Sequence, residues 1–392
     1  MNKKDFKNSF LLISGNIVTV FGNIVLSNSL NLWIIQISGN VKVLGIASSI
    51  TFIPILFFTL FGGIISDSFN KKNIVVICDF FSFILCFIMA ILSTESTINI
   101  YIIVLFRFVL AIITSMFKPA IRSLPSCSIS KDNRIKFNSY FSISENVVQI
   151  VSPAISGILM GLGLSIQLVL ILDGVTFLVS SITEMFITCD NTVKLEKSKR
   201  ISILSRITTA YRYIFLNFDL SCVIVLSSLF NIFIAGYNMF LPYYGSVMGK
   251  SYYGFLLSIE AIGGIVGTFS LRFNIFNFDK KIEVNLFLSV VLFNLFFITH
   301  NVYVLYGIVF VFGVFLTRFN VKFFTYLQNE VSKEFIGRVI SITTVIALVL
   351  MPLGQIIFSN LIDFFGMITF AFIGASMCVL YIFYIIILKK IT

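Results

Sequence analysis

The sequence predicts an all-α membrane protein with twelve transmembrane helices, arranged as two pseudosymmetric six-helix halves. The chain of 392 residues is 58% hydrophobic and only 11% charged, whereas about 25% of the residues of an ordinary soluble domain are charged. Nearly the whole chain divides into apolar runs of about 20 residues, the length that crosses a bilayer as a helix. Lysine and arginine residues gather in alternate connections between these runs.

Twelve apolar runs carry the predicted helices. Lipid offers the backbone no hydrogen-bond partner, so only helices and closed barrels cross a bilayer, and the runs lack the alternation over about 10 residues that barrel strands show. The predicted spans are residues 10–35, 44–66, 73–93, 98–117, 138–162, 166–188, 219–242, 252–272, 283–300, 302–321, 337–359 and 366–388.

The basic residues orient these helices. With the N-terminus in the cytoplasm, 25 of the 28 Lys and Arg residues lie on the cytoplasmic side, Lys42 and Lys250 face outward, and Arg107 lies within the membrane. This asymmetry follows the positive-inside rule. It predicts a multi-pass protein of the inner (cytoplasmic) cell membrane, surrounded by lipid, with both termini in the cytoplasm. It also accounts for the net charge of +11 without nucleic-acid binding.

A polar, basic segment divides the chain. Residues 189–218 form the longest connection, and we interpret them as a cytoplasmic linker between an N-terminal half, residues 1–188, and a C-terminal half, residues 219–392. The halves repeat, because a shift of 209 residues places Lys71 on Lys280 without a gap across the hairpin. Duplicated halves are typical of transporters that work by alternating access around a central site.

The connection after the second span reads GGIISDSFNKK and resembles the signature of the major facilitator superfamily. The positions that match are Gly63, Asp67, Lys71 and Lys72. Ser68 stands where the family usually has Arg, and Asn70 stands where it usually has Gly. The resemblance implies that this segment latches the cytoplasmic gate of a transporter.

Further segments are similar to one branch of that superfamily, which includes macrolide-efflux and siderophore-exporter proteins. They include the motif from Pro153 to Gly157 in the fifth span and the motif that begins at Pro352 in the eleventh. The resemblance implies a monomeric transporter of small molecules, not an enzyme. On local grounds alone, the same prolines and glycine serve to kink and pack helices. The Gly263 to Gly267 spacing in the eighth span likewise predicts close helix packing.

Polar side chains form a stripe along the first span. At roughly 100° per residue, one arc of that helix carries Asn16, Thr19, Asn23 and Asn31. The seventh span, its counterpart in the second half, carries Asn231 and Asn238 on a similar face. Such stripes are unfavourable against lipid, so we expect them to line a substrate cavity. Hydrogen bonding between helices is the alternative.

Three charged residues inside spans are candidates for proton coupling. We expect Glu145 in span five to approach either Arg107 in span four or a hydrated cavity, where protonation could alternate with substrate binding. A permanent structural ion pair is the alternative. Glu260 in span eight has no basic residue near it in sequence and is the second candidate carrier. The carboxylates nearer to helix ends are expected to anchor loops or cap helices: Asp79, Asp173 and Glu184.

The sequence predicts no cofactor, metal site or catalytic centre. His300 is the only histidine, the six cysteines lack metal-like spacing and are interpreted as packing residues, and no nucleophile constellation is present. The segment GSVMGKS has three residues between its glycines where a phosphate-binding loop has four. The resemblance to the efflux branch of the superfamily implies proton-coupled efflux of a small amphipathic compound, such as a drug, a macrolide-like antibiotic or a secreted metabolite. A nutrient symporter and a non-transporting membrane sensor or assembly factor are the alternatives.

Overall fold

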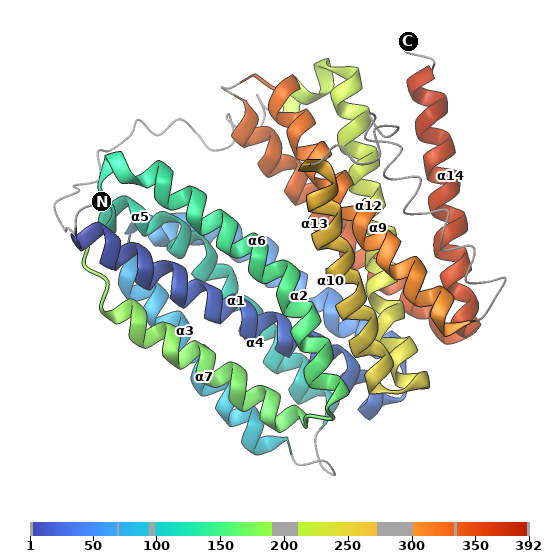
Figure 1. Ribbon diagram of the computed structural model, residues 1–392, viewed down its shortest axis with the longest axis horizontal. Coiled ribbons are helices and arrows are strands. Elements are labelled where there is room, and N and C mark those ends of the chain that lie inside the picture. Colours follow the sequence, from blue (N-terminus) through green and yellow to red (C-terminus); the bar gives the residue numbers. More distant parts are fainter. Residues whose placement is uncertain are drawn as a thin grey trace. The chain divides into compact units, whose positions relative to one another are not determined.

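The computed structural model describes residues 3–68, 70–93, 99–189, 211–272, 301–332 and 335–389, and over these ranges it contains helices and no strand (Figure 1). The helices are α1 (Lys3–Ser38), α2 (Val41–Ser68), α3 (Lys71–Leu92), α4 (Ile100–Ser123), α5 (Pro125–Ser128), α6 (Lys131–Gly161), α7 (Ile166–Met185), α9 (Phe218–Met248), α10 (Lys250–Arg272), α12 (Val302–Glu330), α13 (Ile336–Phe365) and α14 (Thr369–Lys389).

The all-α membrane fold predicted from composition is confirmed. Eleven of the twelve predicted spans coincide with a long helix, and the ninth, residues 283–300, lies outside the described residues. Within the described ranges, nine segments are long and apolar enough to cross a membrane when α13 and α14 are taken together, and the start of α2 is a shorter apolar stretch. The helices are longer than the predicted apolar spans, because polar residues at their ends continue the same hydrogen-bonded turns.

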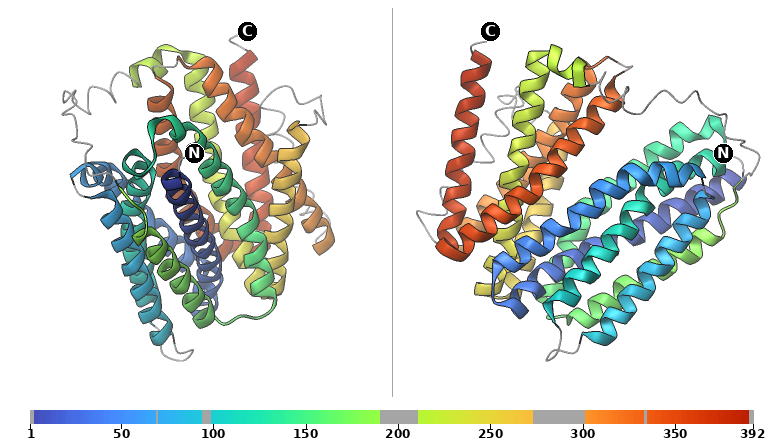
Figure 2. Two further views of the ribbon diagram at one scale, coloured as in Figure 1. Left: turned by 60° about the vertical axis from the view of Figure 1, so that its left-hand side comes forward. Right: turned by 180° about the vertical axis from the view of Figure 1, so that it is seen from behind.

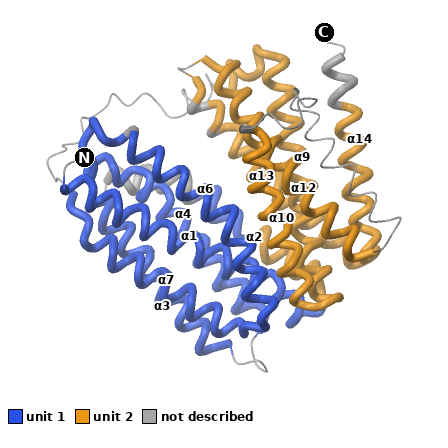
Figure 3. The backbone as a smooth tube through the Cα atoms, in the orientation of Figure 1, with its two compact units in different colours: residues 1–39, 50–196 blue, residues 40–49, 197–392 orange. Residues whose placement is uncertain are grey.

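The chain forms two compact units, coloured separately in Figure 3. The first unit comprises residues 1–39 and 50–196, and the second comprises residues 40–49 and 197–392. Most of the predicted linker, residues 190–210, lies outside the described residues.

In the first unit, α1 packs against α6 and α7, while α3 packs against α7 and α4; these helices run side by side along the length of the unit (Figure 2). Gly22 of α1 allows the close approach to α7, since a Cβ atom at this position would collide with the side chains of Asp173 and Thr176. Small residues at such contacts are characteristic of helix packing in membranes.

An apolar core closes one end of the first unit. Buried side chains from four helices contribute to it, including Leu12, Val75, Phe117, Leu124 and Phe137. Because these side chains come from α1, α3, α6 and the end of α4, this core fixes the helices at the end where the chain begins.

Polar contacts hold the start of α1 at the same end. Asn8 is fully buried, and its Nδ2 donates to the carbonyl oxygens of Ser128 at 2.8 Å and Thr188 at 2.9 Å. Its Oδ1 accepts from the backbone N–H of Thr188 at 3.1 Å. Asp5 accepts from the Ser130 hydroxyl at 2.5 Å. We call this set the N-terminal clamp, because it joins α1 to α5 and to the end of α7.

Two cysteines lie beside the N-terminal clamp. Cys127 of α5 and Cys189 after α7 form a disulfide, with their Cα atoms 5.0 Å apart. The interpretation of all six cysteines as packing residues is therefore wrong for this pair, because sequence spacing carried no information on which loops meet. Cys78 and Cys86 of α3 are buried free thiols and fit that interpretation.

In the second unit, α9 packs against α13, α10 and α14, and α10 packs against α12. A Cβ atom on Gly263 or Gly267 of α10 would collide with the backbone of α12 at Phe310 and Val314. A Cβ atom on Gly313 of α12 would in turn collide with the Glu260 carbonyl. The prediction that the Gly263 to Gly267 spacing serves close helix packing is confirmed, because the two backbones approach where side chains are missing.

The first turns of α2 group with the second unit and bind α13. Ser49 Oγ donates to the Pro352 carbonyl at 3.1 Å, and the Val41 N–H donates to Asp363 Oδ1 at 3.1 Å. Pro352 lies inside α13, where its own ring nitrogen cannot donate.

Candidate functional site

A cavity of about 500 Å³ lies within the first unit, between α1, α3, α4, α6 and α7. We call it the N-unit cavity. Its apolar lining residues are Val20, Ile24, Ile113, Phe117, Ile121 and Phe177. Its polar lining residues are Asn16, Thr19, Asn23, Asp79, Ser82, Thr114, Lys118, Arg122, Glu145 and Gln149. This volume lies within the range of small-molecule sites, which combine apolar walls with a few polar groups.

The polar stripe of α1 supplies one wall of the N-unit cavity. Asn16, Thr19 and Asn23 line it, whereas Asn31 lies beyond its lining. The same side chains also bond between helices: Asn16 Nδ2 donates to Glu145 Oε1 at 3.3 Å, and Thr19 Oγ1 donates to Asp79 Oδ2 at 3.3 Å. Asn16 and Thr19 therefore do both things that were expected of the stripe: they line a cavity, and they form hydrogen bonds to neighbouring helices.

Glu145 of α6 forms an ion pair in this cavity. Arg122 Nη2 of α4 lies 2.5 Å from Glu145 Oε2, and the Arg122 guanidinium lies over the Phe141 ring at 5.5 Å from its centroid. The Glu145 side chain is 15% exposed and that of Arg122 is 60% exposed. Lys118 of α4 lines the same cavity. The cavity thus brings one carboxylate of α6 together with two cations of α4.

The predicted approach of Glu145 and Arg107 is wrong. Arg107 Nη1 donates to Asn31 Oδ1 at 3.0 Å, while Glu145 bonds to Asn16 and Arg122. Asn16 and Asn31 are fifteen residues apart on α1, which is about 22 Å along a helix axis. Because the two charges bond to positions so far apart on one helix, they do not meet. Glu145 instead lines the N-unit cavity, which is the other position expected for it.

Three carboxylates lie deep in the first unit: Asp79 of α3, and Asp173 and Glu184 of α7, which are 2%, 2% and 0% exposed. The expectation that they anchor loops or cap helices is wrong. Asp173 Oδ1 accepts from Thr176 Oγ1 at 3.2 Å, and Ser180 Oγ lies 3.3 Å from Glu184 Oε1.

The α7 spacing is a signal that sequence reasoning missed. Residues 173, 180 and 184 are seven and four apart, which places them on one helical face. That face carries two carboxylates and a hydroxyl, and it lies against α1 and α3.

In the second unit, Glu260 of α10 accepts a hydrogen bond from the hydroxyl of Tyr237 of α9 at 2.9 Å. The sequence places no basic residue near Glu260, and its partner in the structure is a phenol. Asn231 Nδ2 donates to the Ser227 carbonyl of its own helix at 3.1 Å, and Asn238 is exposed. None of these three residues lines the N-unit cavity.

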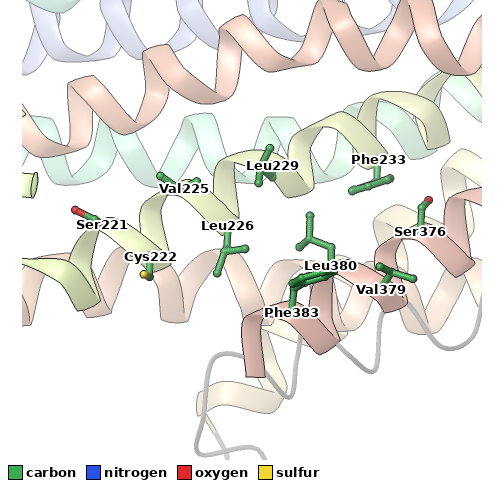
Figure 4. Close-up of a pocket in the computed structure, with 10 residues that line it drawn as sticks. All are labelled: Ser221, Cys222, Val225, Leu226, Leu229, Phe233, Ser376, Val379, Leu380 and Phe383. Carbon is green, nitrogen blue, oxygen red and sulfur yellow. The ribbon is translucent and has the colours of Figure 1, made fainter. Parts of the chain in front are cut away.

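A larger hollow of about 590 Å³ lies in the second unit between α9 and α14 (Figure 4). Figure 4 shows mostly leucine, valine and phenylalanine side chains along it. Its polar groups are limited to Ser221, Cys222 and Ser376. Because this lining has no charged group to form an ion pair with a substrate, we place the candidate site in the N-unit cavity.

The gate motif falls on the end of α2 and the start of α3. Gly63 and Asp67 lie in the last turns of α2, where side chains are not described. Lys71 Nζ donates to Ser126 Oγ of α5 at 3.0 Å. Asn70 caps α3, since its Oδ1 accepts from the Lys72 N–H at 3.1 Å. Its φ of −65° does not require the glycine that the family usually has here.

The helix-kink motif lies inside α6. Pro153 removes one backbone donor from the helix, and Ser152 Oγ donates to the Val148 carbonyl at 2.6 Å one turn earlier. Ser156 and Gly157 are buried. The described residues contain no group of three or more His, Cys, Asp or Glu arranged to hold a metal ion.

Comparisons with known proteins agree with this architecture. A family model described as Major Facilitator Superfamily matches residues 12–355. The Staphyloferrin A transporter of Staphylococcus aureus is 25% identical over 98% of this chain and 96% of that protein. Macrolide efflux protein A of Streptococcus pyogenes is 19% identical over 91% of this chain and 90% of that protein.

Solved structures share the fold at low sequence identity. The crystal structure of the nucleoside transporter NupG has a TM-score of 0.75 and 14% identity, with 99% of this chain and 100% of that chain covered. The crystal structure of a D-xylose–proton symporter has a TM-score of 0.71 and 12% identity, with 97% of each chain covered.

Proposed function

Because the chain belongs to the Major Facilitator Superfamily of membrane transporters, we propose that it exports a small amphipathic compound in exchange for protons. Export would follow alternating access, in which the halves 1–188 and 219–392 rock about the linker 189–218. We place the protein in the cell membrane with both termini in the cytoplasm, because 25 of 28 basic residues then face the cytoplasm. The relative named for macrolide efflux favours export.

The observation that carries this proposal is the lining of the N-unit cavity. The lining combines apolar side chains, including Phe117 and Phe177, with the polar side chains of Asn16, Arg122 and Glu145. An amphipathic molecule suits such a space, since its apolar body gains by leaving water and its polar group finds hydrogen-bonding and charged partners. A wholly apolar or wholly polar compound would interact favourably with only part of this lining.

Glu145 is the proposed point at which proton and substrate compete. Arg122 and Asn16 bond to its carboxylate. A substrate group that donates to this carboxylate needs the ionised form, whereas a proton removes the charge. Binding of one therefore weakens binding of the other, which is the thermodynamic condition for exchange. Glu260, held by Tyr237, is the second proposed carrier.

The test is accumulation of labelled antibiotics and amphipathic dyes in cells with and without the protein. We expect lower accumulation of at least one compound, and loss of this difference after a protonophore collapses the gradient. Glu145→Gln and Glu260→Gln should reduce the effect in variants that still insert normally. Asp132→Asn, an exposed carboxylate at the start of the same helix as Glu145, is the matched control. Full activity in both Gln variants would contradict the coupling mechanism.

Two other results would replace the proposed function. Gradient-driven uptake in the same cells would identify a nutrient symporter. Unchanged retention of every compound, together with a specific protein partner, would identify a sensor or assembly factor that does not transport.

A further inference from the structure

Lys118 of α4 brings a positive charge to the lining of the N-unit cavity. The cavity has four charged lining residues: Asp79, Lys118, Arg122 and Glu145. Arg122 and Glu145 form an ion pair, and Asp79 accepts a hydrogen bond from the Thr19 hydroxyl. Lys118 forms no hydrogen bond and no ion pair with another residue in the part of the chain that the structure describes. Its ammonium group can therefore bind a partner that enters the cavity.

Lys118 lies one helical turn away from the ion pair of Arg122 and Glu145. The end of α4 and the start of α6 both contribute to the apolar core at the end of the unit where the chain begins, so the two helices run in opposite directions from it. Lys118 precedes Arg122 by four residues, and Gln149 follows Glu145 by four. Lys118 and Gln149 thus both lie about 6 Å farther from that end than the ion pair does, and both line the cavity.

Gln149 of α6 adds a hydrogen-bond donor at the level of Lys118. Its side chain is exposed and forms no hydrogen bond to another described residue. A lysine ammonium has three N–H donors and a glutamine amide has two, so the pair can donate to both oxygens of one carboxylate. Asp79 is the remaining negative charge in the lining, but it is 2% exposed, whereas Lys118 and Gln149 are both exposed.

Apolar side chains accompany this pair in the lining. Phe117 precedes Lys118 on α4, Ile113 lies one turn earlier on the same helix, and both line the cavity. Val20 of α1 and Phe177 of α7 contribute further apolar surface. An organic anion can bury an apolar body against these residues, and that burial stabilises binding. An inorganic anion gains nothing from this part of the lining, so the cavity favours an organic one.

We propose that Lys118 and Gln149 form a subsite for the carboxylate of an amphipathic organic acid, and that the exported compound belongs to this class. A hydrogen-bond donor of the same compound would reach Glu145 about one helical turn away. An amphipathic cation would meet the like charge of Lys118, so the subsite discriminates between organic acids and basic drugs. The statement about export rests on the proposed function, whereas binding of the acid does not.

Binding of three probes that share one aromatic body tests the subsite without transport. The probes are naphthylacetate, naphthylacetamide and naphthylethylammonium, which are an anion, its neutral analogue and a cation. Equilibrium dialysis uses the purified full chain in phosphatidylcholine nanodiscs, and empty nanodiscs correct for partition into lipid. The wild type should bind the acid about tenfold or more tightly than the amide, because hydrogen bonds between charged groups are stronger than neutral ones. The cation should bind most weakly.

Substitutions assign this preference to the subsite. Lys118→Gln should bind the acid and the amide equally, Lys118→Arg should keep the preference, and Gln149→Ala should reduce it. Lys131→Gln, which removes an exposed lysine at the start of α6 outside the cavity lining, is the matched control and should behave as the wild type. Equal binding of acid and amide by the wild type, or a preference that survives Lys118→Gln, would overturn the proposal. If Lys118→Gln does not fold, Gln149→Ala carries the comparison and must reduce the preference.

Further arms identify the source of the anion. An excess of inorganic phosphate should leave naphthylacetate bound, and its displacement by an equal concentration of phosphate would overturn the proposal in favour of an inorganic anion. Adding phosphatidylglycerol to the nanodiscs should preserve the preference, and its loss would overturn the proposal in favour of a lipid headgroup. A preference for the acid in a protein that lowers accumulation of no compound in cells would uphold the subsite and refute the proposed export. Export by a protein that lacks the preference would uphold the proposed function and overturn the subsite.

Discussion

Replacing Asn8 by alanine tests the N-terminal clamp. Asn8 makes four hydrogen bonds, two donated to the carbonyl oxygens of Ser128 and Thr188 and two accepted from Thr188, over 2.8–3.3 Å. At about 0.6–1 kcal/mol for each bond, Asn8→Ala should destabilise the first unit by about 2–4 kcal/mol. The Ser128 carbonyl would also lose its partner in a buried place, so the upper half of this range is expected.

Thiol labelling measures this loss within the first unit. Cys78 and Cys86 of α3 are 8% and 0% exposed, so they react with a thiol reagent only when the unit opens. A loss of about 2–4 kcal/mol raises the labelling rate about 30- to 700-fold, at tenfold for every 1.4 kcal/mol. The background replaces the other four cysteines by serine in every variant: Cys127, Cys189, Cys222 and Cys378.

The matched control for Asn8→Ala is Asn146→Ala. Asn146 is exposed on α6, and its replacement should leave the labelling rate within about twofold, since an exposed substitution away from structural contacts usually changes stability by less than about 0.5 kcal/mol. Equal labelling rates for the two variants would refute the view that the clamp holds the start of α1.

Two predictions concern the second unit. Gly263→Ala should destabilise the packing of α10 on α12, because the new Cβ would collide with the Phe310 carbonyl. Gly307→Ala in α12 meets open space and should stabilise the helix by up to about 1 kcal/mol. Thermal unfolding should therefore show a lower unfolding temperature for Gly263→Ala and a higher one for Gly307→Ala, and equal shifts would contradict the close packing. Tyr237→Phe should cost about 1–3 kcal/mol, because Glu260 loses its phenol donor. Adding Glu260→Gln should then cost less than it does in the wild type, and strictly additive losses in the double-mutant cycle would contradict the bond.

The helical fold could be predicted from the sequence because each span carries its own signal. An apolar run of sufficient length predicts a helix in lipid regardless of its neighbours. The polar stripe on α1 also follows from local periodicity, and three of its residues, Asn16, Thr19 and Asn23, line the N-unit cavity.

The partners of the charged residues could not be predicted in the same way. Arg107 and Glu145 lie in neighbouring spans, but which side chains meet depends on the rotation and axial position of each helix. Both charges bond to α1, at Asn31 and Asn16, and not to each other. Tyr237, the partner of Glu260, lies on another helix and is not basic, so neither its position nor its charge in the sequence indicates the pair.

For the buried carboxylates, helical spacing predicts which residues share a face of one helix but not which residue of another helix meets that face. Asp173, Ser180 and Glu184 share a face of α7 by spacing alone, which is a sequence signal for a polar face. That Asp79 of α3 meets this face requires the packing of α3 on α7, which the sequence does not provide.

The central claim is that a proton and an exported compound compete at Glu145 in the N-unit cavity. The most direct measurement is proton release when a compound exported in the accumulation assay binds the purified protein, followed in weakly buffered solution with a pH indicator. We predict that the wild type and Asp132→Asn release protons on binding, and that Glu145→Gln binds the compound with little or no release. Binding without proton release in the wild type, or equal release from Glu145→Gln, would contradict the account.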